Sequence, residues 1–287
     1  MKAPDHAIPK IALHQMRSGI NGQDNLEAMK KAIAAAAAQG AIMYFAPEMS
    51  LLLDRNRQRA ADGLFVESQT TAIKELCAAA AQSAIWVHLG SAAIRPNDRP
   101  DMLANRSIVI DAQGKIRARY DKMHLFDVDL DNGESWRESA AYAAGDTAVL
   151  VQTPLGAMGL TICYDLRFPA LYDRLAQAGA DIFAVPAAFT KPTGAAHWHI
   201  LLRARAIENA AFVVAAAQSG QHEDGRETYG HSSVVGPWGQ ILLDMGDDEG
   251  LGFAEIDLSQ RDSACRQIAI HRHRRDIPVE VTHGERS

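Results

Sequence analysis

The sequence contains few of the features that mark disulfide-stabilised or nucleic-acid-binding proteins. Three cysteines occur among 287 residues, at positions 77, 163 and 265, and no two of them form a CxxC pair. This spacing gives neither a disulfide framework nor a zinc knuckle. Its 29 Lys and Arg residues are outnumbered by 35 Asp and Glu residues, so the formal net charge is -6. A negative charge is the wrong sign for a general phosphate-backbone binder, and we expect no nucleic-acid partner.

Long apolar runs are also missing. The most apolar stretch, residues 32–47, is interrupted by Gln39 and Gly40 before it reaches the roughly 20 residues needed to cross a bilayer. The first ten residues, MKAPDHAIPK, lack the apolar centre of a secretory signal. We therefore expect no membrane partner and no leader, and the sparse cysteines are typical of a reducing, cytoplasmic location.

The remaining composition and patterning predict an α/β fold. Hydrophobic residues make up 47% of the chain, which is enough for a substantial core. Short runs rich in β-branched and aromatic residues alternate with longer helical stretches. No linker or repeat interrupts the alternation, so we expect a single domain over residues 1–287. The expected strands and hairpins cover residues 10–16, 42–45, 84–90, 107–120, 148–162, 181–189, 212–218, 231–245 and 252–258. The expected helices cover residues 25–40, 68–81, 168–180 and 197–210, with a last helix and tail from 259 to about 275.

Three of the expected strand ends carry side chains that suit nucleophilic catalysis. Glu48 follows the strand at 42–45, Lys122 ends one hairpin and Cys163 ends another, at separations of 74 and 41 residues. A cysteine becomes a nucleophile when a base removes its proton, and the acyl intermediate needs positive charge beside its oxyanion. Only a fold that gathers strand ends brings these three together. Because Cys163 lies between a strand and a helix, we expect the helix N-terminus to favour its thiolate.

The segments around these residues are FAPEMS, YDKMHLFD and LTICYDLRFP, and they resemble the Glu-Lys-Cys segments of the nitrilase, or carbon–nitrogen hydrolase, superfamily. The resemblance covers nearly the whole chain. Residues 188–220 and the segment YGHSSVVGPWG at 229–239 are similar to the amidase branch, which includes deaminated glutathione amidases and omega-amidases. Tyr164 and Asp165 follow the cysteine where nitrilases carry Trp-Glu, so nitrile hydrolysis is disfavoured.

The resemblance implies a role for each of these residues. Cys163 would be the nucleophile, Glu48 the general base, Lys122 the cation beside the oxyanion and Glu138, in the RES segment, an assisting second glutamate. A plain helix start is the alternative for Glu138.

Four further residues are expected to bind substrate, namely Arg167, Tyr164, Phe189 and Thr190. The guanidinium of Arg167 suits planar recognition of a substrate carboxylate, with a structural ion pair as the equal alternative. The backbone N–H of Tyr164 would help to hold the oxyanion.

The same resemblance implies a four-layer αββα sandwich, assembled as a homodimer or higher oligomer, with the tail from about residue 276 packing on a partner. No cofactor is expected. We expect no metal either, because the H-x-H segment at His197 and His199 has no nearby third acid or cysteine in the sequence.

The expected reaction is hydrolysis of a small carboxylated amide, with deaminated glutathione giving 2-oxoglutarate and cysteinylglycine. The alternative within the branch is an omega-amidase acting on 2-oxoglutaramate. A more distant alternative is a non-catalytic metabolite-binding scaffold. The loop at 222–227 and the basic run at 271–275 are not assigned a role.

Overall fold

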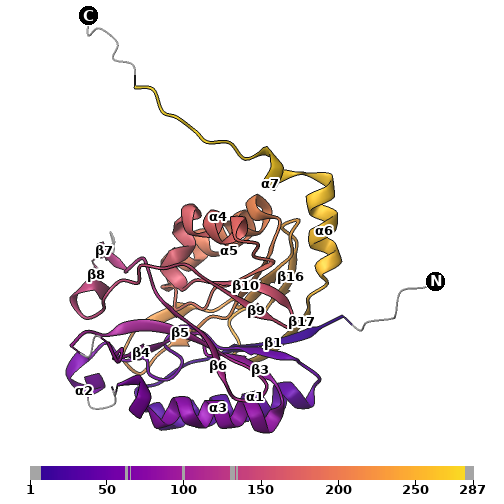
Figure 1. Ribbon diagram of the computed structural model, residues 1–287. Helices are drawn as coiled ribbons and strands as arrows, with labels where there is room; N and C mark the ends of the chain where they lie inside the picture. The colour runs from indigo at the N-terminus through magenta and orange to yellow at the C-terminus, as the bar shows by residue number, and fades with distance from the viewer. Residues whose placement is uncertain are drawn as a thin grey trace, which may run out of the picture.

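Two β-sheets lie face to face between two outer layers of helices in the computed structural model, which describes residues 8–61, 64, 66–98, 101–129, 133 and 135–281 (Figure 1). One sheet is covered by α1 (Gly22–Ala38) and α3 (Thr71–Ser83), and the other by α4 (Pro169–Gln177) and α5 (Lys191–Asn209). The predicted α/β class and its αββα layering are confirmed.

The first sheet has the strand order β17-β1-β2-β3-β5-β4, with β6 paired to β5. Its strands are β1 (Lys10–Gln15), β2 (Met43–Phe45), β3 (Trp86–His88), β4 (Ala92–Ile94), β5 (Ala104–Ile110), β6 (Ile116–Asp121) and β17 (Gly250–Glu255). Strands β1, β2 and β3 run parallel.

The second sheet has the strand order β16-β15-β12-β11-β10-β9, in which β10, β11 and β12 run parallel. Its strands are β9 (Val149–Thr153), β10 (Gly156–Leu160), β11 (Ile182–Ala184), β12 (Phe212–Ala215), β15 (Ser233–Val235) and β16 (Ile241–Asp244). Parallel central strands bring their carboxyl ends to one edge of each sheet, and the site is built at these edges.

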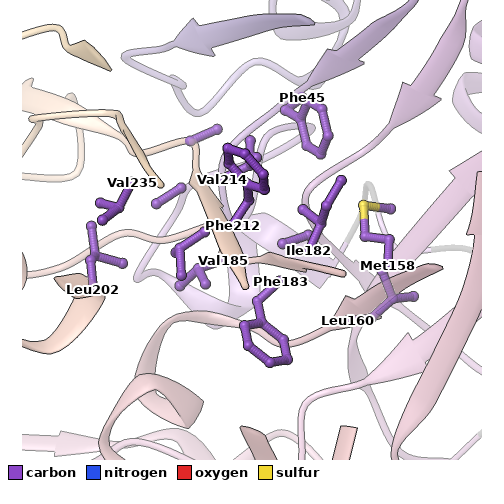
Figure 2. Close-up of a cluster of buried hydrophobic side chains, with 14 of the residues drawn as sticks. Phe45, Met158, Leu160, Ile182, Phe183, Val185, Leu202, Phe212, Val214 and Val235 are labelled. Atoms are coloured by element: carbon purple, nitrogen blue, oxygen red, sulfur yellow. The ribbon is translucent and has the colours of Figure 1, made fainter. Parts of the chain in front are cut away.

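Alternation along the strands divides the core into two clusters. On β1, Ile11 and Leu13 belong to the cluster that includes the space between the sheets, whereas Ala12 belongs to the cluster beneath α1 and α3. Figure 2 shows the first cluster, to which β2 contributes Phe45 and β10 contributes Met158. Because successive strand side chains point to opposite faces, both faces of the first sheet are apolar.

Several helix boundaries differ from the predicted ones. Helix α1 begins at Gly22 rather than at Asn25, because the side chain of Asn21 accepts a hydrogen bond from Gln23 N and caps the helix. Helix α5 begins at Lys191 rather than at residue 197. Pro192 does not prevent this, because a proline in the first turn of a helix loses no intrahelical hydrogen bond.

Short elements missing from the prediction occur in the connections. They include β4, α2 (Arg57–Ala61), the hairpin of β7 (Asp127–Asp129) and β8 (Ser135–Arg137), and the hairpin of β13 (Ser219–Gln221) and β14 (Glu227–Tyr229). The loop at 222–227 therefore closes the β13–β14 hairpin. Its Asp224 accepts a hydrogen bond from Arg55 N, so the loop contacts the connection that follows β2.

Past the second sheet, β17 returns the chain to the first sheet and α6 (Leu258–Gln267) and α7 (Ile270–His273) follow. Beyond α7 the chain runs away from the body as far as residue 281 (Figure 1). The final part of the expected tail, 282–287, and the first residues of the expected domain, 1–7, lie outside the described part. None of the described helices is both long and apolar enough to cross a membrane.

Candidate active site

Glu48 lies in the turn after β2, with 5% of its surface exposed. This turn passes so close to Gly90 that a Cβ at that position would be 2.1 Å from Pro47 O. Gly90 also has φ +77, a left-handed conformation that glycine adopts without a steric penalty. The position of Glu48 therefore depends on a glycine in the neighbouring turn after β3.

Lys122 follows β6 and is 2% exposed. Its backbone N donates to Asn105 O at 2.9 Å, which extends the β5–β6 pairing by one residue. The ammonium Nζ lies 2.9 Å from Glu48 Oε1 and 2.9 Å from Glu138 Oε2. The Lys122 ammonium therefore forms an ion pair with each of the two carboxylates.

Cys163 begins the 3-10 turn Cys163–Arg167, which follows the β9–β10 hairpin. Its φ of +48 is rare for a residue with a side chain, and its backbone N donates to Pro186 O at 2.9 Å. The thiol lies close enough to the Glu48 carboxylate and to the Ala188 N–H for both to affect its pKa. The Ala188 N–H donates to Glu48 Oε2 at 3.0 Å. The N–H of Tyr164 has no acceptor within the turn, because the first N–H groups of a helical turn lack one.

The protonation states follow from burial and the neighbouring charges. Burial and the Glu48 carboxylate raise the pKa of the Cys163 thiol well above its ordinary value, against the opposing effect of Lys122. Burial would also raise the pKa of Glu48, but the charge of Lys122, hydrogen bonds from Lys122 and Asn105 and the neighbouring Cys163 thiol lower it below its ordinary value. The resting site therefore holds a neutral thiol beside a carboxylate.

Lys122 stays charged in this pocket. Burial alone would lower the pKa of its ammonium, but the negative charges of Glu138 and Glu48 outweigh burial and raise the pKa well above its ordinary value. The expectation that a helix N-terminus favours the Cys163 thiolate is wrong. The five-residue 3-10 turn separates Cys163 from the expected helix, which begins at Pro169, and burial beside a carboxylate favours the neutral thiol.

Glu138 joins the same network from the short turn Glu138–Ala140. Its Oε2 accepts from Phe126 N at 2.7 Å as well as from Lys122, and 13% of its side chain is exposed. The structure brings together Glu48, Lys122, Cys163 and Glu138, although they come from four separate segments.

Asn105 is a member of this network that the sequence did not reveal. Its Nδ2 donates to Glu48 Oε1 at 2.8 Å and to Glu138 Oε1 at 3.1 Å, so one amide joins both carboxylates. Its Oδ1 is buried and finds no hydrogen-bond partner among the described residues. An asparagine in a strand gives no local sequence signal, and Asn105 lies two residues before the predicted hairpin.

Asp165 connects the cysteine turn to the segment that carries Lys122. Its fully buried carboxylate accepts from Ile162 N at 2.9 Å, from the Tyr120 hydroxyl at 2.7 Å and from the backbone N of His124 at 3.0 Å. In the sequence, Asp165 served only to distinguish the amidase branch from the nitrilases. His124 Nδ1 also lies 2.7 Å from Asp165 Oδ1, so this buried acid fixes the two segments relative to each other.

The residues expected to bind substrate border the cysteine turn. The guanidinium of Arg167 lies 5.3 Å from the centre of the Phe189 ring and 5.9 Å from that of Tyr164, and its Nη1 is 3.2 Å from His197 Nδ1. Among the described residues, no carboxylate lies within ion-pair distance of Arg167. The alternative of a structural ion pair therefore finds no support in the described part of the chain.

Phe189 and Thr190 lie at the entrance to α5. The Phe189 ring is buried and packs on Trp198 with ring centres 4.9 Å apart. The Thr190 hydroxyl is 2.8 Å from that of Thr193. The Thr190 carbonyl oxygen also accepts from Gly194 N at 2.8 Å, so both its hydroxyl and its carbonyl already have intramolecular hydrogen bonds.

Comparisons with known proteins match most of the chain. The pattern of the family described as carbon-nitrogen hydrolase matches residues 10–266. A deaminated glutathione amidase from Yersinia enterocolitica is 38% identical over 274 residues, which are 93% of this chain and 93% of that protein.

Solved structures are similar too. The crystal structure of the C. elegans NitFhit protein has a TM-score of 0.85 and 36% identity, and the match covers 94% of this chain and 66% of that one. This chain thus spans about two thirds of the worm protein. An amidase from Nesterenkonia sp. AN1, solved as a mutant with the acetamide moiety of fluoroacetamide covalently added at its active site cysteine, has a TM-score of 0.77 and 26% identity, covering 95% of this chain and 98% of that one.

Proposed function

This chain belongs to the carbon–nitrogen hydrolase family and is an amidase, and from that premise we propose that it cleaves a small carboxylated amide through a thioester on Cys163. One observation carries the proposal: the buried Cys163 thiol lies beside the Glu48 carboxylate, which is itself bound to the Lys122 ammonium. An acid and a cation beside a nucleophile meet the needs of acyl transfer.

In the first half of the reaction, Glu48 takes the thiol proton as Cys163 Sγ attacks the amide carbon. The carbonyl oxygen becomes an oxyanion, which the Lys122 ammonium and the Tyr164 N–H stabilise. Protonated Glu48 then gives its proton to the leaving nitrogen, and the carbon–nitrogen bond breaks. The neutral amine departs and a thioester remains on Cys163.

In the second half, Glu48 takes a proton from water, whose oxygen attacks the thioester carbon. The same oxyanion contacts act again, and collapse of the intermediate releases the carboxylic acid while Sγ regains a proton. Glu138 assists by keeping Lys122 in place, since it contacts the ammonium at 2.9 Å. The pKa of Glu48 is lowered and that of Cys163 is raised, so Glu48 is available as a base while the thiol keeps its proton. These shifts support proton transfer from the thiol to Glu48 during the attack.

Arg167 supports a substrate that carries a carboxylate near its reacting amide. Arg167 is four residues after the nucleophile in the sequence, and its guanidinium lies over the Phe189 ring. A guanidinium binds a carboxylate through two parallel hydrogen bonds. Deaminated glutathione fits this requirement, and the Yersinia relative carries its name. Its hydrolysis would give 2-oxoglutarate and cysteinylglycine.

The second candidate within the family is an omega-amidase that acts on 2-oxoglutaramate. Both substrates supply the same acyl group, so the Arg167 region suits both, and they differ in the leaving group. A non-catalytic scaffold is disfavoured, because the chain is an amidase by family and has an acid, a lysine and a cysteine in one pocket.

Product analysis separates these candidates. The purified protein is given deaminated glutathione or 2-oxoglutaramate, and 2-oxoglutarate, cysteinylglycine and ammonia are measured. We expect 2-oxoglutarate and cysteinylglycine without ammonia, at a higher kcat/KM than for 2-oxoglutaramate. Preferential release of ammonia from 2-oxoglutaramate would overturn the substrate assignment and leave the mechanism standing.

The mechanism itself is tested with two cysteine variants. Cys163→Ala should lower turnover by roughly a thousandfold or more, because the nucleophile and the base beside it act as a unit. Cys265→Ala, in α6, is the matched control and should keep wild-type turnover. Wild-type turnover in Cys163→Ala would refute the thioester route.

We also propose a homodimer, supported by large apolar side chains exposed on neighbouring elements. Ile200 and Ile207 are 69% and 49% exposed on one face of α5, and Trp238, in the β15–β16 turn, is 54% exposed. On the extended tail, Ile277 and Val279 are 84% and 83% exposed. A second copy of the chain would cover such a patch, with the tail packing on the partner.

We also propose a cellular setting and a class of ligand from the cysteines and the net charge. The three free cysteines support a reducing, cytoplasmic location. The net charge of -6 supports the absence of a nucleic-acid partner, so the small amide substrate would be the main ligand.

A further inference from the structure

Two histidines and an aspartate from three separate elements meet beside α5. His199 lies in α5, His231 precedes β15, and Asp244 is the last residue of β16. One donor atom from each residue lies within 4.8 Å of those of the other two. His199 Nε2 is 2.9 Å from Asp244 Oδ2, and His231 Nδ1 is 2.9 Å from Asp244 Oδ1. We refer to these three residues as the His–His–Asp group.

The backbone and ring of His231 are fixed by their neighbours. Its φ is +55, a conformation that residues other than glycine seldom adopt. Trp198 Nε1 donates to its carbonyl oxygen at 2.9 Å, and the Tyr229 ring stacks on the imidazole with ring centres 4.4 Å apart. Such an unfavourable conformation persists where the surroundings enforce it, and it is common at ligand sites.

Asp244 is fixed in place by the backbone as well as by the two histidines. Its Oδ1 accepts from Gly246 N at 3.0 Å in addition to the contact with His231. The group therefore offers two imidazoles and one carboxylate that already point at one another.

We propose that His199, His231 and Asp244 bind a divalent transition-metal ion, with Zn²⁺ as the preferred species. Two imidazole nitrogens and a carboxylate oxygen are a known three-residue zinc donor set, with water as the fourth ligand. The three side chains are 24–33% exposed, so solvent reaches them. The charge of the carboxylate offsets part of the charge of the ion.

A nearby acid completes the surroundings. Asp247 Oδ1 is 3.6 Å from His231 Nε2, the ring nitrogen that faces away from Asp244. When one imidazole nitrogen binds a metal, the other donates to a carboxylate or carbonyl that fixes the ring, and Asp247 is placed for this role.

A bound metal would act as a structural clamp, that is, a crosslink between elements that are distant in the sequence. It joins α5 to the end of β16, and α5 begins immediately after Phe189 and Thr190. None of Glu48, Lys122 and Cys163 belongs to the group, so the clamp is independent of the proposed amide hydrolysis.

The proposal departs from the sequence expectation of no metal for a reason visible in the fold. The H-x-H segment alone supplies no site, because His197 turns toward Arg167 while His199 meets Asp244. The second histidine and the acid come from positions 32 and 45 residues further along the chain.

Metal titration of defined variants tests the clamp. Metal-free protein carrying Cys163→Ala, which removes the buried thiol as a competing ligand, is titrated with Zn²⁺ by calorimetry while its thermal midpoint is recorded. We expect one Zn²⁺ per chain and a midpoint that rises with Zn²⁺ concentration, because a ligand bound to the folded state stabilises it.

Three substitutions in that background should each abolish the saturable binding: His199→Gln, Asp244→Asn and His231→Asn. Asparagine is chosen at 231 because it tolerates a left-handed backbone. His273→Gln, an exposed histidine on α7, is the matched control and should bind normally. Absence of one-to-one binding, or binding that persists in all three variants with the metal-free midpoint unchanged, would overturn the proposal.

Discussion

At the scale of single residues, Glu48 and Cys163 share one pocket and respond to it in opposite ways. Burial raises the pKa of the thiol, whereas the charge of Lys122 outweighs burial and lowers the pKa of Glu48. The base thus stays ionised, and the nucleophile keeps its proton until the substrate arrives. This pairing has a direct consequence for the dependence of activity on pH.

We expect kcat/KM to stay flat from neutral pH down past the ordinary pKa of a glutamic acid, and to fall only where Glu48 becomes protonated. The sign follows from the lowered pKa, because the active carboxylate persists into more acidic solution. A pH profile of kcat/KM measures this limb. An acidic limb above the ordinary glutamate pKa would contradict the proposed ionisation.

The thiol gives an independent measurement of the same state. Burial and Glu48 raise the pKa of the Cys163 thiol. The rate at which iodoacetamide alkylates Cys163 should therefore rise only in strongly alkaline solution, because the thiolate is the reactive form. Fast alkylation at neutral pH that matches a free thiolate would contradict a neutral resting thiol.

At the scale of elements, the turns after strands determine where the reactive groups point. Cys163 has φ +48 and Met49, which follows Glu48, has φ +55. The sequence predicted that Glu48, Lys122 and Cys163 lie at strand ends, and the structure agrees. It did not predict the left-handed backbone at the two turns, since neither position carries glycine.

Gly90→Ala tests the dependence of the Glu48 turn on its neighbour. The new Cβ would lie 2.1 Å from Pro47 O at φ +77, so the turn must shift and amide hydrolysis should fall steeply. The free energy of unfolding should also fall by more than about 1 kcal/mol, because alanine disfavours positive φ. Activity assays and denaturant titration measure the two effects.

Gly40→Ala is the matched control. Gly40 has φ +82, but nothing lies within 4 Å of a Cβ built there. This variant should lose stability through backbone strain alone and keep its turnover. Equal activity in Gly90→Ala and Gly40→Ala would show that the contact with Pro47 does not position Glu48.

At the scale of the whole molecule, the proposed homodimer makes a measurable claim about the exposed face of α5. Replacing Ile200 and Ile207 together by Glu should convert the dimer to a monomer, because burying unpaired carboxylates is costly. Sedimentation velocity at several concentrations measures the change.

Met102→Glu is the control, since Met102 is an apolar side chain 43% exposed outside this patch. It should leave the assembly unchanged. A wild-type monomer, or a dimer that survives both α5 substitutions, would contradict the proposed interface.

The order of strands and helices and the chemical types of the reactive residues were determined by the sequence itself. Alternating apolar runs fix which faces of strands are buried, and motifs around Glu48, Lys122 and Cys163 identify the family. These are local properties, so a single chain displays them directly.

Only the tertiary structure decided which distant groups share a hydrogen bond. Asn105 joins Glu48 to Glu138, Asp165 fixes the cysteine turn, and Asp244 meets His199, all across gaps of more than 30 residues. The protonation of Cys163 was likewise decided by burial and a neighbouring charge rather than by its place after a strand. Contacts and dielectric surroundings of this kind depend on how both sheets pack, and no local pattern in the sequence specifies them.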